Sequence, residues 1–217
     1  MKNIPRIFVN DNMAPGAIVQ VGRDVSHYLT HVMRNRDCIA FGGGDEFTAR
    51  LSDDGRALEI LESTGRADPA GNVVLYCALI KRMDDLVNMV TQMGVKEIRP
   101  VITERTVAPH INIERMEKIA IAAAQQSNRN SVPKIFPPVR FDTLDLSNMI
   151  FADESAAHGV TLPASATGTC VLTGPEGGFS DTELAALRGA GARGISLGKT
   201  VLRAELAAAI AISRIEQ

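Results

Sequence analysis

The alternation of hydrophobic and polar residues changes its period near residue 70. Up to residue 63 it favours short strands broken by turns that contain glycine and aspartate. One helix is predicted from Arg23 to Arg34. A small β-barrel would close such strands without exposed edges, so we predict a barrel in this part. Its predicted strands are Arg6–Val9, Ala17–Val21, Cys38–Phe41, Glu46–Leu51 and Ala57–Leu61.

From Val73 onward the pattern is that of strands alternating with helices. This alternation predicts an α/β domain with a largely parallel sheet over residues 71–217, preceded by a first domain over residues 1–70 and a linker at Gly65–Asn72. The predicted strands are Val73–Ile80, Glu97–Ile102, Met149–Ala152, Thr169–Thr173 and Gly194–Leu197. The predicted helices are one from Met83 that ends at Gly94, then Ile113–Gln126, Asp181–Gly189 and Arg203–Ile215.

Composition narrows the class of protein. Hydrophobic residues make up 45% of the 217 and charged residues 22%, as in a soluble protein with a real core. No apolar run is long enough to span a membrane, and the first residues lack the apolar core of a secretory signal, so we expect a cytoplasmic protein. The three cysteines (Cys38, Cys77 and Cys170) are widely spaced, which argues against a disulfide framework or a zinc site and favours buried thiols.

Net charge does not point to a nucleic-acid partner. It is −2, with 8 basic and 10 acidic residues up to residue 70 and 15 of each after it. Any RNA-binding surface must therefore be a local patch.

Two glycine-containing segments each lie between a predicted strand and a predicted helix. The first is Thr173–Ser180, where Ser180 and Glu183 form a capping box for the helix that follows. The second is Leu197–Glu205, where Arg203 stands near a helix N-terminus that disfavours a cation. Each segment could be a plain turn, and Arg203 could simply pair with Glu205. Alternatively, two such loops at the carboxyl ends of strands would form a cofactor crevice.

Three further polar segments are compatible with either a structural or a binding role. Gln125–Pro133 is a polar helix end stopped by proline, and Thr103–Thr106 directly follows a strand. His27 and His31 are four residues apart on a predicted helix, as in a metal pair, but no third ligand accompanies them, so we predict no metal site. With Arg23, Arg34 and Arg36, these histidines could face RNA phosphates or form a solvated surface.

In this order the segments resemble the RsmE family of 16S ribosomal RNA uridine N3-methyltransferases. The resemblance covers nearly the whole chain and is specific because it is an ordered set. Its motifs are Arg6-Ile7-Phe8-Val9, His27-Tyr28-Leu29 to Val32-Met33-Arg34, Gly94-Val95, Pro100, Thr103-Glu104-Arg105, Gln126-Ser127 with Arg129, Val132-Pro133, Gly174-Pro175-Glu176-Gly177-Gly178-Phe179 and Leu202-Arg203-Ala204-Glu205.

The resemblance implies a fold, a cofactor and partners. It implies an N-terminal PUA-like β-barrel that grips RNA, and a C-terminal SPOUT domain with a parallel sheet and a trefoil knot. It also implies a homodimer that uses S-adenosyl-L-methionine to methylate N3 of a uridine in 16S ribosomal RNA of the small ribosomal subunit. The cofactor residues carried over are Leu172, Thr173, Gly174, Glu176, Gly177, Gly178, Leu197, Gly198, Val201 and Leu202.

Uracil N3 carries a proton at neutral pH, so the enzyme must remove it or stabilise the anion. Arg203 is the candidate for stabilising the developing charge. Glu176 is either the base or an acceptor of backbone N–H groups that fixes its glycine loop. The residues expected to bind RNA are Arg6, Arg23, His27, His31, Arg34, Arg36, Arg105, Gln126 and Arg129.

The chain departs from the usual family pattern at several positions, which leaves other functions open. One alternative is a catalytically silent RNA-binding or ribosome-assembly factor that keeps the fold. Another is a nucleotide-dependent metabolic enzyme, which the absence of G-x-G-x-x-G disfavours. The departures are at Gln92-Met93, Ala122, Gln125, Thr200 and Leu206.

Overall fold

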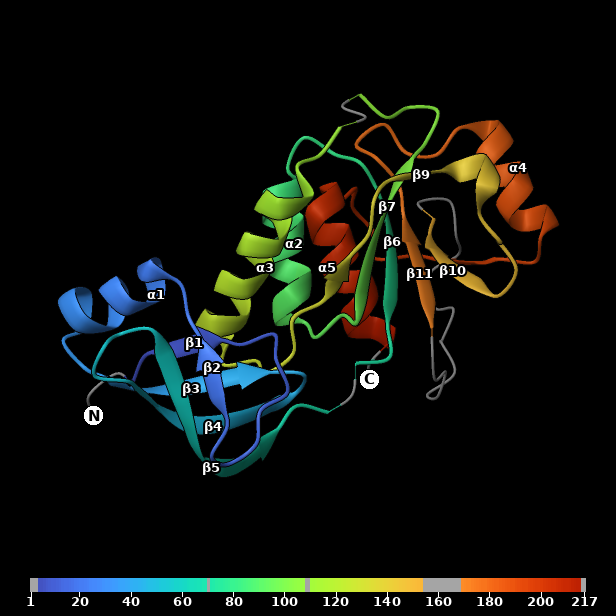
Figure 1. The fold of residues 1–217 in the computed structure, drawn as a ribbon. Helices are drawn as coiled ribbons and strands as arrows, with labels where there is room; N and C mark the ends of the chain where they lie inside the picture. The colour runs from blue at the N-terminus through green and yellow to red at the C-terminus, as the bar shows by residue number, and fades with distance from the viewer. Residues whose placement is uncertain (1–3, 70, 108–109, 154–168, 216–217) are drawn as a thin grey trace. The chain divides into compact units, whose positions relative to one another are not determined.

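The computed structural model describes residues 4–69, 71–107, 110–153 and 169–215 (Figure 1). The chain separates into two compact units. Unit 1 comprises Met1–Ala70 and Ala124–Val132, and unit 2 comprises Gly71–Ala123 and Pro133–Gln217. The short segment Ala124–Val132 therefore belongs with the first part of the chain, although division of the sequence at residue 70 places it in the second.

Unit 1 is built on a five-stranded sheet. The strand order is β1-β3-β4-β5-β2, in which β1 and β3 are parallel and the other pairs antiparallel. In the described residues the two edge strands, β1 and β2, do not pair with each other. The sheet is therefore open and forms a half-barrel, whereas the sequence pattern predicted a barrel that closes. The strands are β1 (Arg6–Phe8), β2 (Ile18–Gln20), β3 (Asp37–Gly42), β4 (Asp45–Leu51) and β5 (Ala57–Ala67).

Strand β5 is longer than the sequence predicts. It continues to Ala67 and so includes the start of the segment predicted as a linker, where Ala67 is paired with Asp45. Two shifts of register between β4 and β5 and a left-handed Gly65 (φ +74°) accompany this extension. Bulges and glycine let a strand bend while its pairing continues, so turn-like composition did not mark the strand's end here.

The helix predicted from Arg23 to Arg34 is irregular and shorter. It consists of α1 (Arg23–His27) followed by a π-helical turn η1 (Tyr28–Val32). Its inner face packs Leu29 into the core of the half-barrel, where that side chain is fully buried. Arg34 lies beyond the helix in the left-handed region (φ +50°), which explains why the helix stops before it.

Unit 2 has the predicted parallel sheet. Its main strand order is β12-β10-β11-β6-β7-β8, every pair is parallel, and β9 also pairs with β7. The two-residue strands β8 and β9 were not predicted, because two residues carry no periodicity. The strands are β6 (Val74–Ala78), β7 (Glu97–Ile102), β8 (Lys134–Ile135), β9 (Val139–Arg140), β10 (Met149–Ala152), β11 (Cys170–Thr173) and β12 (Arg193–Ile195).

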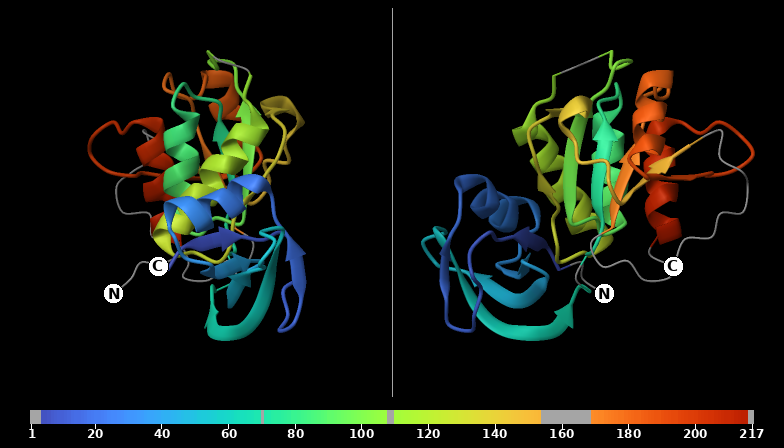
Figure 2. Two further views of the ribbon diagram at one scale, coloured as in Figure 1. Left: turned by 60° about the vertical axis from the view of Figure 1, so that its left-hand side comes forward. Right: turned by 90° about the vertical axis from the view of Figure 1, so that its right-hand side faces the viewer.

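Helices cover both faces of this sheet (Figures 1 and 2). On one face lie α2 (Met83–Gln92), α3 (Ile113–Ser127) and α5 (Ala204–Ile215), with α2 packed against α5. On the other face α4 (Asp181–Gly189) contributes to a core of side chains from the sheet and from the turn η2 (Phe141–Thr143). Parallel sheets need this cover because both of their faces are apolar.

Cysteine placement agrees with the expectation of structural thiols. Cys38 and Cys77 are buried, and burial raises the pKa of each thiol to about 12. Cys170 is partly exposed, and burial also raises its pKa. Across the ranges that the structure describes, no three His, Cys, Asp or Glu residues gather as a metal site would require, and no helix is long and apolar enough to cross a membrane.

Candidate active site

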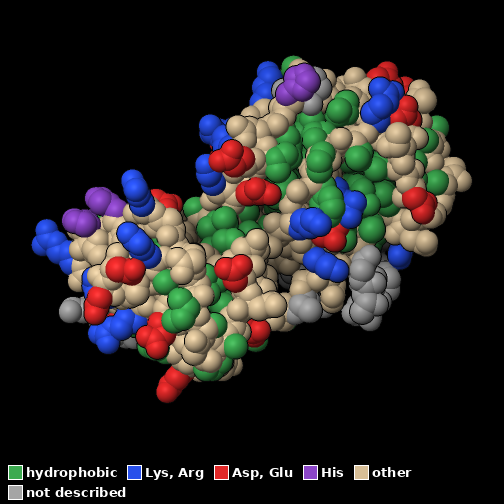
Figure 3. Space-filling view, viewed as in Figure 1, with side chains coloured by type: hydrophobic (Ala, Val, Ile, Leu, Met, Phe, Trp, Pro, Cys, Tyr) green, Lys and Arg blue, Asp and Glu red, His purple; other side chains and the backbone are tan. Residues whose placement is uncertain are grey.

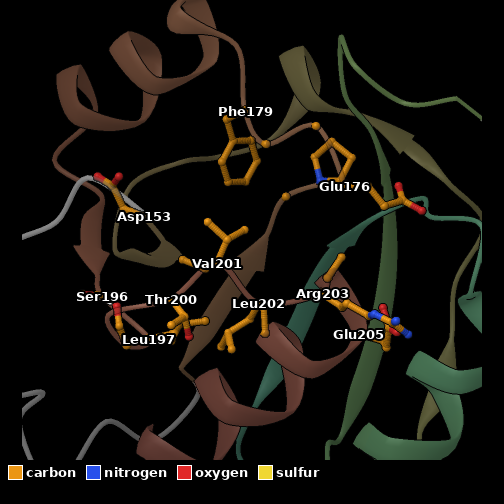
Figure 4. A pocket seen from close by; sticks show the side chains of 18 of the residues that line it. Asp153, Glu176, Phe179, Ser196, Leu197, Thr200, Val201, Leu202, Arg203 and Glu205 are labelled. Carbon is orange, nitrogen blue, oxygen red and sulfur yellow. Dashed lines mark hydrogen bonds between the residues drawn. The ribbon is translucent and has the colours of Figure 1, made fainter.

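A cavity of about 930 Å³ opens at the carboxyl ends of the parallel strands of unit 2 (Figure 4). The residues after β11 form one wall and those after β12 form another, so the structure brings the two predicted glycine segments together. Smaller parts come from the residues that follow β6, β7 and β10, including Arg82, Arg105 and Asp153. Ligands of parallel α/β sheets bind at this edge.

Eight of the ten residues predicted to hold the cofactor line this cavity. Leu172 and Thr173 do not, because they are buried inside β11, and Leu172 packs with Phe179 in the core beneath the loop. The eight that line it are Gly174, Glu176, Gly177, Gly178, Leu197, Gly198, Val201 and Leu202.

The first glycine loop, residues 174–180 between β11 and α4, is held by hydrogen bonds from segments far away in the sequence. Arg105 donates from Nη1 to the carbonyls of Gly177 (2.8 Å) and Phe179 (3.2 Å). Glu176 accepts the backbone N–H of Lys81 on Oε1 at 3.0 Å. Gly178 turns the chain at φ +69°, a conformation that favours glycine. Arg105, predicted as an RNA-binding residue, is therefore used to fix this loop.

The capping box predicted at Ser180 is present and extends further than expected. Ser180 Oγ accepts the N–H of Glu183 at 3.2 Å, and Glu183 Oε2 accepts the N–H of Ser180 at 2.9 Å. The other carboxylate oxygen of the buried Glu183 accepts the N–H of Glu104 at 2.9 Å. One side chain thus ties the start of α4 to the turn after β7.

The second glycine loop, residues 196–203 between β12 and α5, is held by hydrogen bonds from the end of α5, the helix that follows it. Arg214, in the last turn of α5, donates to the carbonyls of Ser196 (2.5 Å) and Leu197 (3.1 Å). Ser196 Oγ donates to the carbonyl of Gly198 at 3.2 Å. No local pattern predicts this role of Arg214, because its partners lie 17 and 18 residues earlier and depend on how the loop folds back.

The charged residues of the cavity are paired in a way that the sequence left open. Glu205 is only 5% exposed and pairs with Arg82 at 3.3 Å, rather than with Arg203. Arg203 is exposed and makes no ion pair within the described residues. Figure 4 places Arg203 and Glu205 together at the start of α5, on the side of the cavity near Glu176.

Asp153 is a further acidic residue of the cavity that sequence reasoning missed. It directly follows β10, is 7% exposed, and pairs with Arg188 of α4 at 3.0 Å. Figure 4 places it across the cavity from Arg203. A polar residue just after a buried strand was the only sequence signal available for it.

Comparison with known proteins identifies the family. A family model described as an RNA methyltransferase domain matches residues 67–216. The chain is 32% identical to ribosomal RNA small subunit methyltransferase E of Rickettsia conorii, over 97% of this chain and 94% of the relative. It belongs to the ribosomal RNA small subunit methyltransferase E family. This outcome confirms the family resemblance inferred from the ordered motifs.

Solved structures of similar proteins agree with this assignment. The methyltransferase E of Neisseria gonorrhoeae, solved with bound S-adenosyl methionine, has a TM-score of 0.85 and 29% identity, over 97% of this chain and 96% of that one. A putative methyltransferase of Legionella pneumophila, solved with the same cofactor, has a TM-score of 0.81 and 25% identity, over 99% of this chain and 97% of that one. The α/β fold with its parallel sheet is thus the fold of these structures.

Two arginines of this methyltransferase E chain that were predicted to bind RNA are instead used inside unit 1. Arg6 is 10% exposed at its side chain and contacts Glu46 at 2.5 Å and Asn130 Oδ1 at 2.7 Å. Arg129 is 19% exposed and pairs with Asp68 at 3.3 Å. Their guanidinium groups stabilise the fold of the unit, and RNA contacts at these two positions stay a prediction.

Other predicted RNA-binding residues of the family member do lie at the surface. Arg23, His27, His31 and Arg34 are exposed, and Figure 3 shows basic and histidine side chains gathered over α1 and η1. The rings of the two histidines stack with centroids 4.7 Å apart. Arg36 is paired with Asp53 at 2.5 Å, while Gln126 is exposed near the end of α3.

Proposed function

We propose that this chain transfers a methyl group from S-adenosyl-L-methionine to N3 of a uridine in 16S ribosomal RNA of the small ribosomal subunit. The observation that carries the proposal is the cavity between the two glycine loops, at the strand ends where parallel α/β sheets bind their ligands. Membership of the methyltransferase E family supports the reaction and the RNA substrate.

The residues of the cavity fit S-adenosyl-L-methionine. Its volume lies within the range of about 300–1,000 Å³ usual for small-molecule sites. A Cβ atom added at Gly178 or Gly198 would meet no protein atom within 4 Å, so both glycines leave open space beside the backbone. Val201 and Leu202 supply apolar surface for an adenine ring, and the loops supply backbone N–H and C=O groups for its polar edge.

The bound cofactor would supply a methyl group on a sulfonium, and the protein must then present a nucleophilic uracil N3. Arg203 suits this task because its guanidinium group is exposed at the cavity and forms no ion pair with a carboxylate of the described residues. A fixed cation there stabilises the uracil anion as the proton leaves. For Glu176, the bond from Lys81 N–H favours the bracing role over the role of base.

Glu176→Ala should weaken binding of S-adenosyl-L-methionine about two- to tenfold, because one net hydrogen bond is worth about 0.5–1.5 kcal/mol. Glu176→Gln keeps an acceptor for Lys81 N–H and should lose less. Isothermal calorimetry measures both affinities. If Glu176 were the base, the glutamine variant would bind the cofactor normally, lose turnover, and recover partly at higher pH as uracil ionises by itself.

We extend the proposal to the rest of the family architecture. Unit 1 would be a PUA-like RNA-binding domain, for which its half-barrel and the exposed side chains of Arg23, His27, His31 and Arg34 give support. Unit 2 would be a SPOUT domain whose glycine loops belong to a trefoil knot. The protein would act in the cytoplasm as a homodimer, a state that sedimentation equilibrium measures directly.

Replacing Arg23 and Arg34 together by alanine should weaken binding of 16S ribosomal RNA and reduce its dependence on salt. Each phosphate contact that is lost lowers the slope of log affinity against log salt by about 1. Filter binding at several salt concentrations gives the slope. Arg50→Ala with Arg56→Ala is the matched control, because it removes two basic residues of unit 1 outside α1 and η1. An equal loss of slope in that control would contradict the assigned surface.

The alternative of a catalytically silent factor rests on the departures from the family pattern. Ala122 and Leu206 are exposed, so they leave the buried core unchanged. Gln125 donates to the carbonyl of Arg6 at 2.8 Å and so has a structural use within unit 1. Thr200 lies at the cavity, but it is exposed and leaves the glycines of both loops in place. The architecture of the site therefore favours the enzyme.

Mass-spectrometric mapping of ribosomal RNA from cells with and without this protein tests the function. We expect one 3-methyluridine of 16S ribosomal RNA to disappear when the protein is removed and to return when it is supplied. Unchanged ribosomal RNA in both cells would overturn the proposal, and cofactor binding measured alongside would separate a silent factor from an enzyme with another substrate.

A further inference from the structure

Arg82 lies at the cavity next to Glu205, a buried glutamate of its lining. It is the N-cap residue of α2, and its Nη1 atom is 3.3 Å from Glu205 Oε1 in α5, 123 residues later. The side chain of Arg82 is 55% exposed, whereas that of Glu205 is 6% exposed. Arg82 also contacts a second carboxylate, that of Asp85, at 3.4 Å, and the side chain of Asp85 is exposed.

Glu205 needs a cation because its carboxylate is removed from water. A buried carboxylate without a partner is strongly disfavoured, although the N-terminal turn of a helix compensates part of its charge. Two arginines of the cavity lining are candidates to pair with Glu205. Arg82 is close to Glu205 in the fold, and Arg203 is close to it in the sequence. Only Arg82 is within ion-pair distance, so Glu205 is satisfied without Arg203.

We propose that Arg82 is a positioning residue that holds Glu205 and thereby keeps the charge of Arg203 available to the target base. This rests on the proposed function, in which Arg203 stabilises the uracil anion. Without Arg82, the carboxylate of Glu205 would attract the guanidinium of Arg203, which immediately precedes the helix that contains Glu205. An arginine drawn to Glu205 would no longer stabilise charge on the substrate.

A double-mutant cycle with the full-length protein tests the proposal. Arg82→Met should lower kcat about tenfold, with the KM for RNA and the affinity for S-adenosyl-L-methionine changed less than about threefold, since turnover depends on a preorganised charge. In a Glu205→Gln background the same substitution should have no effect on kcat, because no carboxylate remains to attract Arg203. Equal losses in both backgrounds would mean that Arg82 contacts the RNA itself, and would overturn the proposal.

Two further variants guard against a purely structural effect. Arg82→Lys keeps a cation beside Glu205 and should restore most of the lost kcat; a loss as large as that of Arg82→Met would overturn the proposal. Asp85→Asn removes only the exposed partner of Arg82 and should leave kcat unchanged. If Arg82→Met fails to fold, the comparison of Arg82→Lys with the wild type and of the double variant with Glu205→Gln still decides the question.

Chemical modification tests the same idea without any methylation assay. Phenylglyoxal should modify Arg203 quickly in the wild type and several-fold more slowly in Arg82→Met, measured by peptide mass spectrometry with the exposed Arg23 as internal reference. Unchanged reactivity of Arg203 would overturn the proposal. If the wild type methylates no ribosomal RNA, the proposed function fails, while the reactivity of Arg203 still reports whether Arg82 controls it.

Discussion

Gly198→Val is expected to reduce the affinity for S-adenosyl-L-methionine about ten- to hundredfold. Gly198 lines the cavity, and a Cβ atom at this position would meet no protein atom within 4 Å, so the added side chain would extend into open space at the site. When the cofactor is bound it fills this space, and side-chain bulk forced into a filled site costs about 1–3 kcal/mol, in line with this loss of affinity. Calorimetric titration of the purified variant measures it.

Gly191→Val provides the matched control for this experiment. Gly191 follows α4, lies outside the cavity lining, has a positive φ (+80°) as Gly198 does (+157°), and likewise has no atom within 4 Å of an added Cβ. Its variant should bind the cofactor as the wild type does, after correction for any fraction that is unfolded in a thermal melt. A folded Gly198→Val protein with wild-type affinity would remove the second loop from the cofactor site.

The fold of unit 2 was predictable where the sequence has strong local signals. The strands Glu97–Ile102 and Met149–Ala152 were placed at their observed bounds, since the first begins with alternating charged and apolar residues and the second is a short apolar run. The helix Asp181–Gly189 was also placed correctly, because its capping box fixes the first turn. The position of the cavity followed from the rule that loops at the carboxyl ends of parallel strands lie together.

The pairing of charges was not predictable in the same way. Arg105 contacts Gly177, 72 residues later, and Arg82 contacts Glu205, 123 residues later. Such partners are set by the tertiary fold, and no periodic pattern encodes them. For the same reason the pairing of Arg6 with Glu46, 40 residues later, was not predicted, because an arginine that is paired internally looks no different in the sequence from an exposed one.

The irregular parts of unit 1 were also beyond local signals. Strand β5 passes through Gly65 because bulged pairing with β4 sustains it, although glycine and the polar residues around it normally mark a turn. The π-helical turn Tyr28–Val32 replaces the last part of the predicted helix, and hydrophobic spacing does not distinguish it from an α-helix. In both places tertiary contacts outweigh local preference.

Arg203→Ala is expected to lower kcat about a hundredfold or more while the affinity for S-adenosyl-L-methionine stays within about threefold, as when one preorganised charge donor is lost. The effect falls on turnover because the charge on uracil develops only as its proton leaves. Single-turnover methylation of 16S ribosomal RNA with saturating cofactor measures it. Arg193→Ala is the control, since Arg193 is an exposed arginine in β12 outside the cavity lining.

The pH dependence of the Arg203→Ala variant tests how Arg203 acts. A cation beside N3 favours the ionised form and lowers the pKa of the bound uracil, so the wild type should reach its maximal rate at a lower pH than the variant. We therefore expect the ratio of the wild-type to the Arg203→Ala rate to be largest near neutral pH and to narrow as pH rises. A large ratio that does not change with pH would assign Arg203 to positioning of the RNA, and wild-type turnover of the variant at neutral pH would exclude Arg203 from catalysis.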